Sequence, residues 1–284
     1  MAGRYLKAPL SYVVARINTS PLPKLVNEQG AYLGQEMALN GLIFREHSDA
    51  KQFDFTRLVI DVPDDPFKIE LVNRTCFLDK SKTNSFLIEQ NGLEFRTTSY
   101  TTYYNFIESF EKLLQTLIEC VPAIGKAQIG EVVLSYVDVI VPSEGYELKD
   151  FFSKKDLALP MNAYGHQDGV YKSAKNEFNS VIDEKHRVSI SLEQIPQSVG
   201  RLIPDSMIEP EGKFGMPINL HYPPSKQKED DYIILSTFSA QIHDASLEEK
   251  NLQEIFKDAH SYSREAFDSL IDPEVCNKVW EYKE

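Results

Sequence analysis

Tyrosines and arginines are the residues of this chain whose spacing could serve binding chemistry. Tyr100, Tyr103 and Tyr104 stand close together where a predicted strand meets a predicted helix, and rings grouped in this way can stack on nucleobases. Four arginines on predicted strands could line one face of a sheet and contact phosphates: Arg16, Arg57, Arg74 and Arg96. One hypothesis is therefore a nucleotide or nucleic-acid binding surface. The competing interpretation is that the tyrosines pack at a helix boundary.

The motifs that usually carry catalytic chemistry do not occur in this sequence. It has no Gly-rich phosphate loop, no dinucleotide fingerprint, no nucleophile elbow and no HExxH pair. His243-Asp244 follows a predicted strand and could orient a metal or a base, but such a pair is more often a turn element. Glu70 and Glu94 lack the neighbouring Lys of a nuclease site, so we expect them to face solvent. We predict no catalytic residue, no cofactor and no metal ligand.

His260 is a further candidate binding residue, because its polar ring lies in the predicted C-terminal helix. The three cysteines, Cys76, Cys120 and Cys276, are widely spaced and form no CxxC pair, which fits neither a zinc site nor a disulfide framework. We expect each cysteine to be a small buried side chain in a reducing compartment.

Net charge is the strongest global feature of the chain. The formal charge is −13 at pH 7 and the isoelectric point is about 5.0. This field opposes binding to nucleic acid and favours a basic protein partner. The first residues lack the apolar stretch of a secretory signal, and no stretch approaches a membrane span, so we expect a cytoplasmic protein that does not contact membranes.

Hydrophobic periodicity predicts an α+β protein. The predicted strands cover residues 10–17, 53–62, 67–78, 85–89, 93–98, 132–141, 170–182, 187–195 and 232–242. Helices are predicted within 22–42, over a stripe from Phe106 to Leu117, from a capping box at Ser246 and Glu249 onwards, and after the cap Asp272. Asn91-Gly92 predicts a two-residue hairpin, because both residues tolerate positive φ. Thr101 or Thr102 can cap the helix that contains Phe106.

The order of these elements predicts an antiparallel or mixed sheet with long amphipathic helices packed on one face. Residues 132–141 are the most hydrophobic strand and should be central. The chain divides into two loosely similar α+β halves, 1–145 and 146–284, which could also form one continuous domain. The Pro-rich segment 196–224 is predicted to be irregular and available as a recognition loop.

Four short stretches resemble a sporadically distributed bacterial family of unknown function and of about this length. Ala8-Pro9-Leu10 with Val13-Val14 is similar to its "PL-x-x-VV" start, and Tyr100-x-x-Tyr103-x-x-Phe106 to its "Y-x-x-(W/Y)-x-x-F" signature. Residues 134–140 resemble its "LRYIN-x-I" strand, with Ser135 in place of arginine and Asp138 in place of asparagine. His260, Phe267 and Asp272 resemble its final helix and cap. The resemblance implies no activity, and the family's patchy distribution implies mobile or defence-associated genes.

Our leading hypothesis is a non-enzymatic protein-binding or accessory component, within a bacterial defence or toxin–antitoxin-like system. The alternative is a nucleotide or nucleic-acid binding protein that uses the tyrosines and strand arginines. A third hypothesis is a hydrolase in which His186, His243 or His260 meets a carboxylate in a cleft. The sequence predicts neither the partner nor the oligomeric state.

Overall fold

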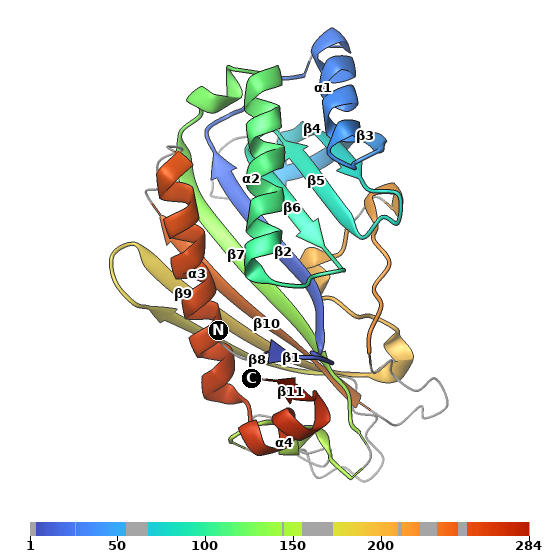
Figure 1. Cartoon of the computed structure of the whole chain (residues 1–284), viewed down its shortest axis with the longest axis vertical. Helices are drawn as coiled ribbons and strands as arrows, with labels where there is room; N and C mark the ends of the chain where they lie inside the picture. Colours follow the sequence, from blue (N-terminus) through green and yellow to red (C-terminus); the bar gives the residue numbers. More distant parts are fainter. Residues whose placement is uncertain are drawn as a thin grey trace, which may run out of the picture.

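The computed structural model describes residues 4–25, 27–54, 68–143, 145–154, 173–209, 212–221, 232–243 and 249–283. It is an α+β fold built on one nine-stranded antiparallel sheet (Figure 1). The sheet strands are β2 (Leu10–Thr19), β3 (Phe44–Asp54), β4 (Lys68–Leu78), β5 (Asn84–Glu89), β6 (Gly92–Thr97), β7 (Ile129–Ile140), β8 (Ala174–Val181), β9 (His186–Pro196) and β10 (Tyr232–His243). The helices are α1 (Asn27–Leu39), α2 (Tyr103–Cys120), α3 (Glu249–Leu270) and α4 (Pro273–Val279).

The strands lie in the order β3-β4-β5-β6-β2-β7-β10-β9-β8. The meander β3 to β6 is therefore followed in space by β2, which pairs with both β6 and β7. The predicted central position of β7 is confirmed, since it lies between β2 and β10. Strands from both predicted halves of the chain contribute to this one sheet. The two ends of the chain also meet, because β1 (Arg4–Tyr5) pairs with β11 (Tyr282–Lys283).

The side chains of β2 point alternately to the two faces of the sheet and so form two sets. Val13, Ala15 and Ile17 are fully buried in the main hydrophobic core. Their neighbours Tyr12 and Val14 point to the other side of the pleat, where they form a smaller cluster. Both sides of the central strands therefore carry packed residues, as expected for strands in the middle of a large sheet.

The amphipathic stripe of α2 packs into the main core. Phe110 and Leu117 are almost completely buried, and the core also contains Phe256 of α3. Burying a side chain of this size stabilises the fold by about 2 kcal/mol. Helix α3 packs along β7 and β10 (Figure 1). Of the two predicted caps, Thr101 and Thr102, Thr102 is the N-cap of α2, and its hydroxyl accepts a hydrogen bond from the Asn105 backbone N–H.

The described part of the Pro-rich segment is irregular, as predicted, with short 3₁₀ turns at Gln197–Val199, Asp205–Met207 and Gly212–Phe214. It packs on the sheet side that carries Tyr12 and Val14. Met216 contacts that cluster, and Phe214 is fully buried with Cys76 and Leu87 in a third one. The segment thus supplies a layer of apolar side chains to the sheet.

Some expected boundaries are wrong. The helix predicted within 22–42 is α1, which covers only Asn27–Leu39. The side chain of Arg45 on β3 lies against this helix at Gly30, where an added Cβ atom would be 2.3 Å from the Arg45 guanidinium group. Gly30 and Gly34 of α1 therefore make room for the Arg45 side chain of the neighbouring strand β3. Strand β3 begins at Phe44, before the expected 53–62, most of which lies outside the described residues.

Other local predictions had mixed outcomes. The predicted hairpin between β5 and β6 is confirmed, but its two turn residues are Gln90 and Asn91. The prediction that Asn91 and Gly92 adopt positive φ is wrong, since neither residue has a positive φ. Asp272 caps α4 as expected, accepting from the Glu274 and Val275 N–H groups. The capping box at Ser246 lies outside the described residues. Among the described helices, none is both long enough and apolar enough to cross a membrane.

Candidate functional site

The predicted site residues separate into two groups in the structure. Tyr100, Tyr103 and His260 come together, although about half the chain separates the tyrosines from the histidine. Arg74 and Arg96 also come together, on the other side of the sheet. Arg57 lies outside the described residues.

The first group is a buried tyrosine–histidine cluster completed by Tyr136 of β7. The Tyr136 hydroxyl lies 2.8 Å from Nδ1 of His260 on α3. The His260 ring stacks on Tyr103, with ring centres 4.4 Å apart and planes within 9°. Tyr100 meets Tyr136 edge to face at 5.9 Å. The cluster therefore joins β7, the start of α2 and the middle of α3.

Burial keeps every member of this cluster neutral. Burial, and to a lesser extent the positive charge of Arg264, lower the pKa of His260 from 6.5 to about 4. Burial raises the pKa of Tyr100 to about 12 and that of Tyr136 well above its ordinary value. An acid–base catalyst at neutral pH needs a pKa near 7, and these groups lie far from it on both sides. The arrangement therefore suits a structural role, in which the cluster holds two helices against the sheet, better than it suits proton transfer.

The three clustered tyrosines do not present their rings together to solvent. Tyr103 is only 8% exposed and one face of its ring is covered by His260. Tyr104 is 76% exposed and meets Tyr103 edge to face at 5.6 Å. A stacking platform at this position would therefore consist of the Tyr104 ring alone.

The second group is an ion-pair network of three arginines and three glutamates, which we call the Arg–Glu network: Arg16, Arg74, Arg96, Glu89, Glu94 and Glu209. The five members from β2, β4, β5 and β6 lie on one side of the sheet, because Arg16 pairs in register with Glu94 and these strands alternate. Glu209 comes from the Pro-rich segment.

Each arginine of the network binds two glutamates. Arg16 donates to Glu94 at 2.8 Å and to Glu89 at 3.0 Å. Arg74 donates to Glu89 at 2.9 Å and holds both oxygens of Glu209, with Nη2 at 2.9 Å. Arg96 donates to Glu209 at 2.8 Å and to Glu94. The charges balance, since three positive groups face three negative groups.

The positive and negative charges of the Arg–Glu network have to balance because most of its side chains are buried. The side chains of Arg74, Arg96, Glu94 and Glu209 are each less than one-tenth exposed. Burial alone would raise the pKa of Glu209, but hydrogen bonds from Arg74 and Arg96 hold it below its ordinary value. Glu94, which the sequence analysis expected to face solvent, is buried, and that expectation is wrong. Its pKa is likewise lowered by Arg96 and Arg16 against the effect of burial.

A pocket of about 160 Å³ adjoins the network. Its polar lining comes from Arg96, Glu209 and Tyr12. Its apolar lining comes mainly from the Pro-rich segment: Ile203, Met207, Ile208, Phe214, Met216 and Ile218. Glu209 was not predicted, because Asp205 and Glu211 lie close to it in the sequence and nothing in the spacing distinguishes a buried carboxylate from these neighbours.

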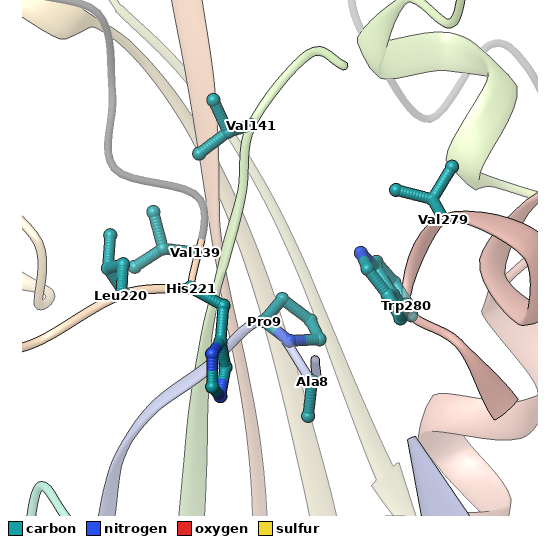
Figure 2. Close-up of a pocket in the computed structure, with 8 residues that line it drawn as sticks. All are labelled: Ala8, Pro9, Val139, Val141, Leu220, His221, Val279 and Trp280. Atoms are coloured by element: carbon teal, nitrogen blue, oxygen red, sulfur yellow. The ribbon is translucent and has the colours of Figure 1, made fainter. Parts of the chain in front are cut away.

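A second pocket lies between the N-terminal residues and α4 (Figure 2). Figure 2 shows Trp280 and Val279 on one side, Leu220 and His221 on the other, and Pro9 between them. Its volume of about 10 Å³ is near the least space that one water molecule needs. We therefore assign it no ligand.

The remaining histidines that the sequence analysis named lie in turns and at strand ends. His186 is 2.7 Å from Asp183, which also accepts from the backbone N–H groups of Lys185 and His186, as in a tight turn. His243 is 3.7 Å from Glu131, and Asp244 lies outside the described residues. Within the described ranges, no group of three or more His, Cys, Asp or Glu could hold a metal ion. The three cysteines are free thiols; Cys76 and Cys276 are buried and Cys120 is half-buried.

No protein-family model matches this chain, and no curated protein is similar to it at a significant level. The resemblance to the bacterial family of unknown function therefore stays a prediction. The site has to be interpreted from its own geometry.

Proposed function

We propose that this chain is a non-enzymatic protein-binding component whose partner adds an extended segment to the outer edge of the sheet at β8. One observation carries the proposal. Strand β8 is the last strand in the sheet order, and its side chains from Glu177 to Val181 are all exposed. Phe178 is 42% exposed, Val181 is 70% exposed, and Ile182 beyond the strand is 45% exposed. Natural proteins usually blunt or cover such an edge, because it can template a further strand.

The rest of the sheet is less accessible to a partner. We infer that α2 and α3 cover the same face, since both contribute to one core with Val13 and Leu134. The Pro-rich segment covers apolar residues on the opposite side, such as Val14 and Leu87. This arrangement would leave the edges as the places where backbone groups can be reached.

The occupant that we propose is an extended, basic segment of a different protein. A second copy of this chain would bring two molecules of charge −13 together, and their repulsion opposes association. A basic segment is attracted by the same field. Phe178 and Val181 are three positions apart and therefore point to opposite faces of β8, so apolar residues three positions apart in that segment would match them. A role in a bacterial defence or toxin–antitoxin-like system rests on the sequence resemblance and belongs to the same proposal.

The nucleotide or nucleic-acid hypothesis receives less support. Arg16, Arg74 and Arg96 are each paired with two glutamates, so their charge is already compensated. Tyr100 and Tyr103 lie in a separate, largely buried cluster, and Tyr104 is exposed beside it. A phosphate-binding face needs uncompensated positive charge.

The test compares edge variants in quantitative co-purification from the source organism. In Phe178→Lys and Val181→Lys, a charge replaces an exposed apolar side chain on β8, which should block strand addition. Leu39→Lys is the matched control, because Leu39 is 80% exposed on the distant helix α1. We expect one stoichiometric partner with the wild-type chain and with Leu39→Lys, and its loss with both edge variants.

Hydrogen exchange on the reconstituted complex then locates the contact. Backbone amides of β8 should become protected when the partner is added, because strand addition pairs them. A partner that is retained by both edge variants, or protection confined to another element, would contradict the proposal. A homodimer that light scattering detects and that the edge variants abolish would also contradict the proposal, because the occupant of the edge would then be a second copy of this chain.

A further inference from the structure

Glu209 is the one member of the Arg–Glu network that does not belong to the sheet. Arg16, Arg74, Glu89, Glu94 and Arg96 stand on neighbouring strands, whose pairing fixes their positions. Glu209 reaches them from the irregular Pro-rich segment. Without Glu209, the five sheet residues carry one positive charge more than negative. The sheet therefore presents a site for one anion, and the chain fills it with its own carboxylate.

The geometry at Glu209 is that of carboxylate recognition. Arg74 holds both carboxylate oxygens through its two terminal nitrogens, and Arg96 adds a third donor at 2.8 Å. Such forked pairing is how a guanidinium group binds a carboxylate or a phosphate. The ring of Phe214 also lies against Arg74, at 5.2 Å, which fixes the plane of the guanidinium.

The adjoining pocket offers room for the body of a ligand. Its volume of about 160 Å³ is close to that of an engineered cavity of about 150 Å³ that binds benzene. Apolar side chains form most of its wall, and Arg96 and Glu209 stand together in its lining. A ligand seated there would have its apolar part against Met207 and Phe214 and its anionic end beside the two guanidinium groups.

We propose that Arg74, Arg96 and this pocket form a binding site for a small carboxylate with an aromatic or branched apolar body, and that Glu209 occupies its anion position in the unliganded chain. Exchange of one carboxylate for another leaves the network balanced, so no buried charge is left unpaired when Glu209 moves away. When a ligand is bound, the ion pairs of Glu209 with Arg74 and Arg96 would no longer attach the Pro-rich segment to the sheet. The proposal is independent of strand addition at β8.

The experiment measures binding of benzoate by titration calorimetry, with benzyl alcohol as an uncharged probe of similar shape. Glu209→Gln keeps the size of the side chain and removes the competing charge. We expect benzoate to bind Glu209→Gln at least about tenfold more tightly than the wild type, because the two buried guanidinium groups have then each lost one of their two carboxylates. Benzyl alcohol should show no such gain.

Glu193→Gln is the matched control. Glu193 forms a part-buried ion pair with Arg201 at the start of the same segment, and this pair does not involve Arg74 or Arg96. If Glu193→Gln tightens benzoate binding as much as Glu209→Gln does, loosening of the segment is the cause and the proposal fails. It also fails if folded Glu209→Gln does not bind benzoate, or if benzyl alcohol binds equally well.

A measurement on the wild type keeps the proposal testable if Glu209→Gln does not fold. Met207 and Met216 line the pocket, whereas Met37 is fully buried in the main core. In a spectrum of ¹³C-methyl-labelled methionine, benzoate should shift the Met207 and Met216 signals to saturation and leave Met37 unchanged. Unshifted Met207 and Met216 signals, or equal shifts with benzyl alcohol, would overturn the proposal.

Discussion

Asp138 is a carboxylic acid in an environment that disfavours its ionised form. It is 5% exposed on β7, in register with Ser236 of β10 and Leu10 of β2. Burial raises the pKa of Asp138 from 3.8 to about 7. A carboxylic acid in the folded protein that titrates near neutrality binds a proton more tightly than it does in the unfolded chain. Its contribution to stability is therefore present at low pH and is lost as the pH rises toward 7.

We predict that Asp138→Asn becomes progressively more stable than the wild type as the pH rises. Asparagine has the same shape and stays neutral, so it avoids the loss that ionisation causes. The difference in unfolding free energy should grow by about 2 kcal/mol between about pH 5 and about pH 8. Urea denaturation of both proteins at several pH values measures it.

The pH-dependent contribution of His260 to the unfolding free energy is the same in the wild type and in Asp138→Asn, so it cancels in this comparison. Its pKa is lowered to about 4, so its own contribution has the opposite sign and is lost as the pH falls below the unfolded value of 6.5. A stability difference that does not change with pH would show that folding does not raise the pKa of Asp138 and would contradict the assignment.

At the scale of single elements, α2 illustrates how local signals and packing combine. Its stripe of buried side chains repeats at helical spacing, and the Thr102 hydroxyl satisfies the first free N–H group that it can reach, that of Asn105. The helix carries Tyr103 at its first turn and so positions one side of the tyrosine–histidine cluster.

Thr102→Ala should lower the free energy of unfolding by about 1 kcal/mol, because it leaves an N–H group of α2 without its cap. Thr101→Ala is the control, since the Thr101 hydroxyl accepts a hydrogen bond from the exposed side chain of Asn105. Its effect should lie within about 0.5 kcal/mol. Thermal or urea denaturation distinguishes the two, and equal effects would argue against capping by Thr102.

At the scale of the whole molecule, charge is the dominant feature. A net charge of −13 repels itself in the compact state. The Arg–Glu network is balanced and largely buried, so dissolved ions screen it little. Salt should therefore act mainly on the repulsion between exposed acidic side chains.

We predict that raising sodium chloride from about 10 mM to about 0.5 M increases the melting temperature by about 2–4 °C, through screening of this repulsion. A variant with Glu254→Gln and Asp258→Asn, two exposed positions on α3, should start from a higher melting temperature and respond less to salt. Differential scanning calorimetry gives both values. A fall in melting temperature with salt would show that exposed ion pairs outweigh the repulsion.

Features of this fold that depend on short spacing can be predicted from the amino-acid sequence. The apolar stripe from Phe106 to Leu117 requires a helix, and the run in β7 requires a buried strand, because each pattern has one periodicity that hides it from water. The tertiary structure alone decided which polar groups meet. Arg74 and Glu209 are 135 residues apart and Tyr136 and His260 are 124 apart, so only the strand order and the path of the Pro-rich segment bring them together. Burial then changes their chemistry, because a charge removed from water must find a partner or be neutralised.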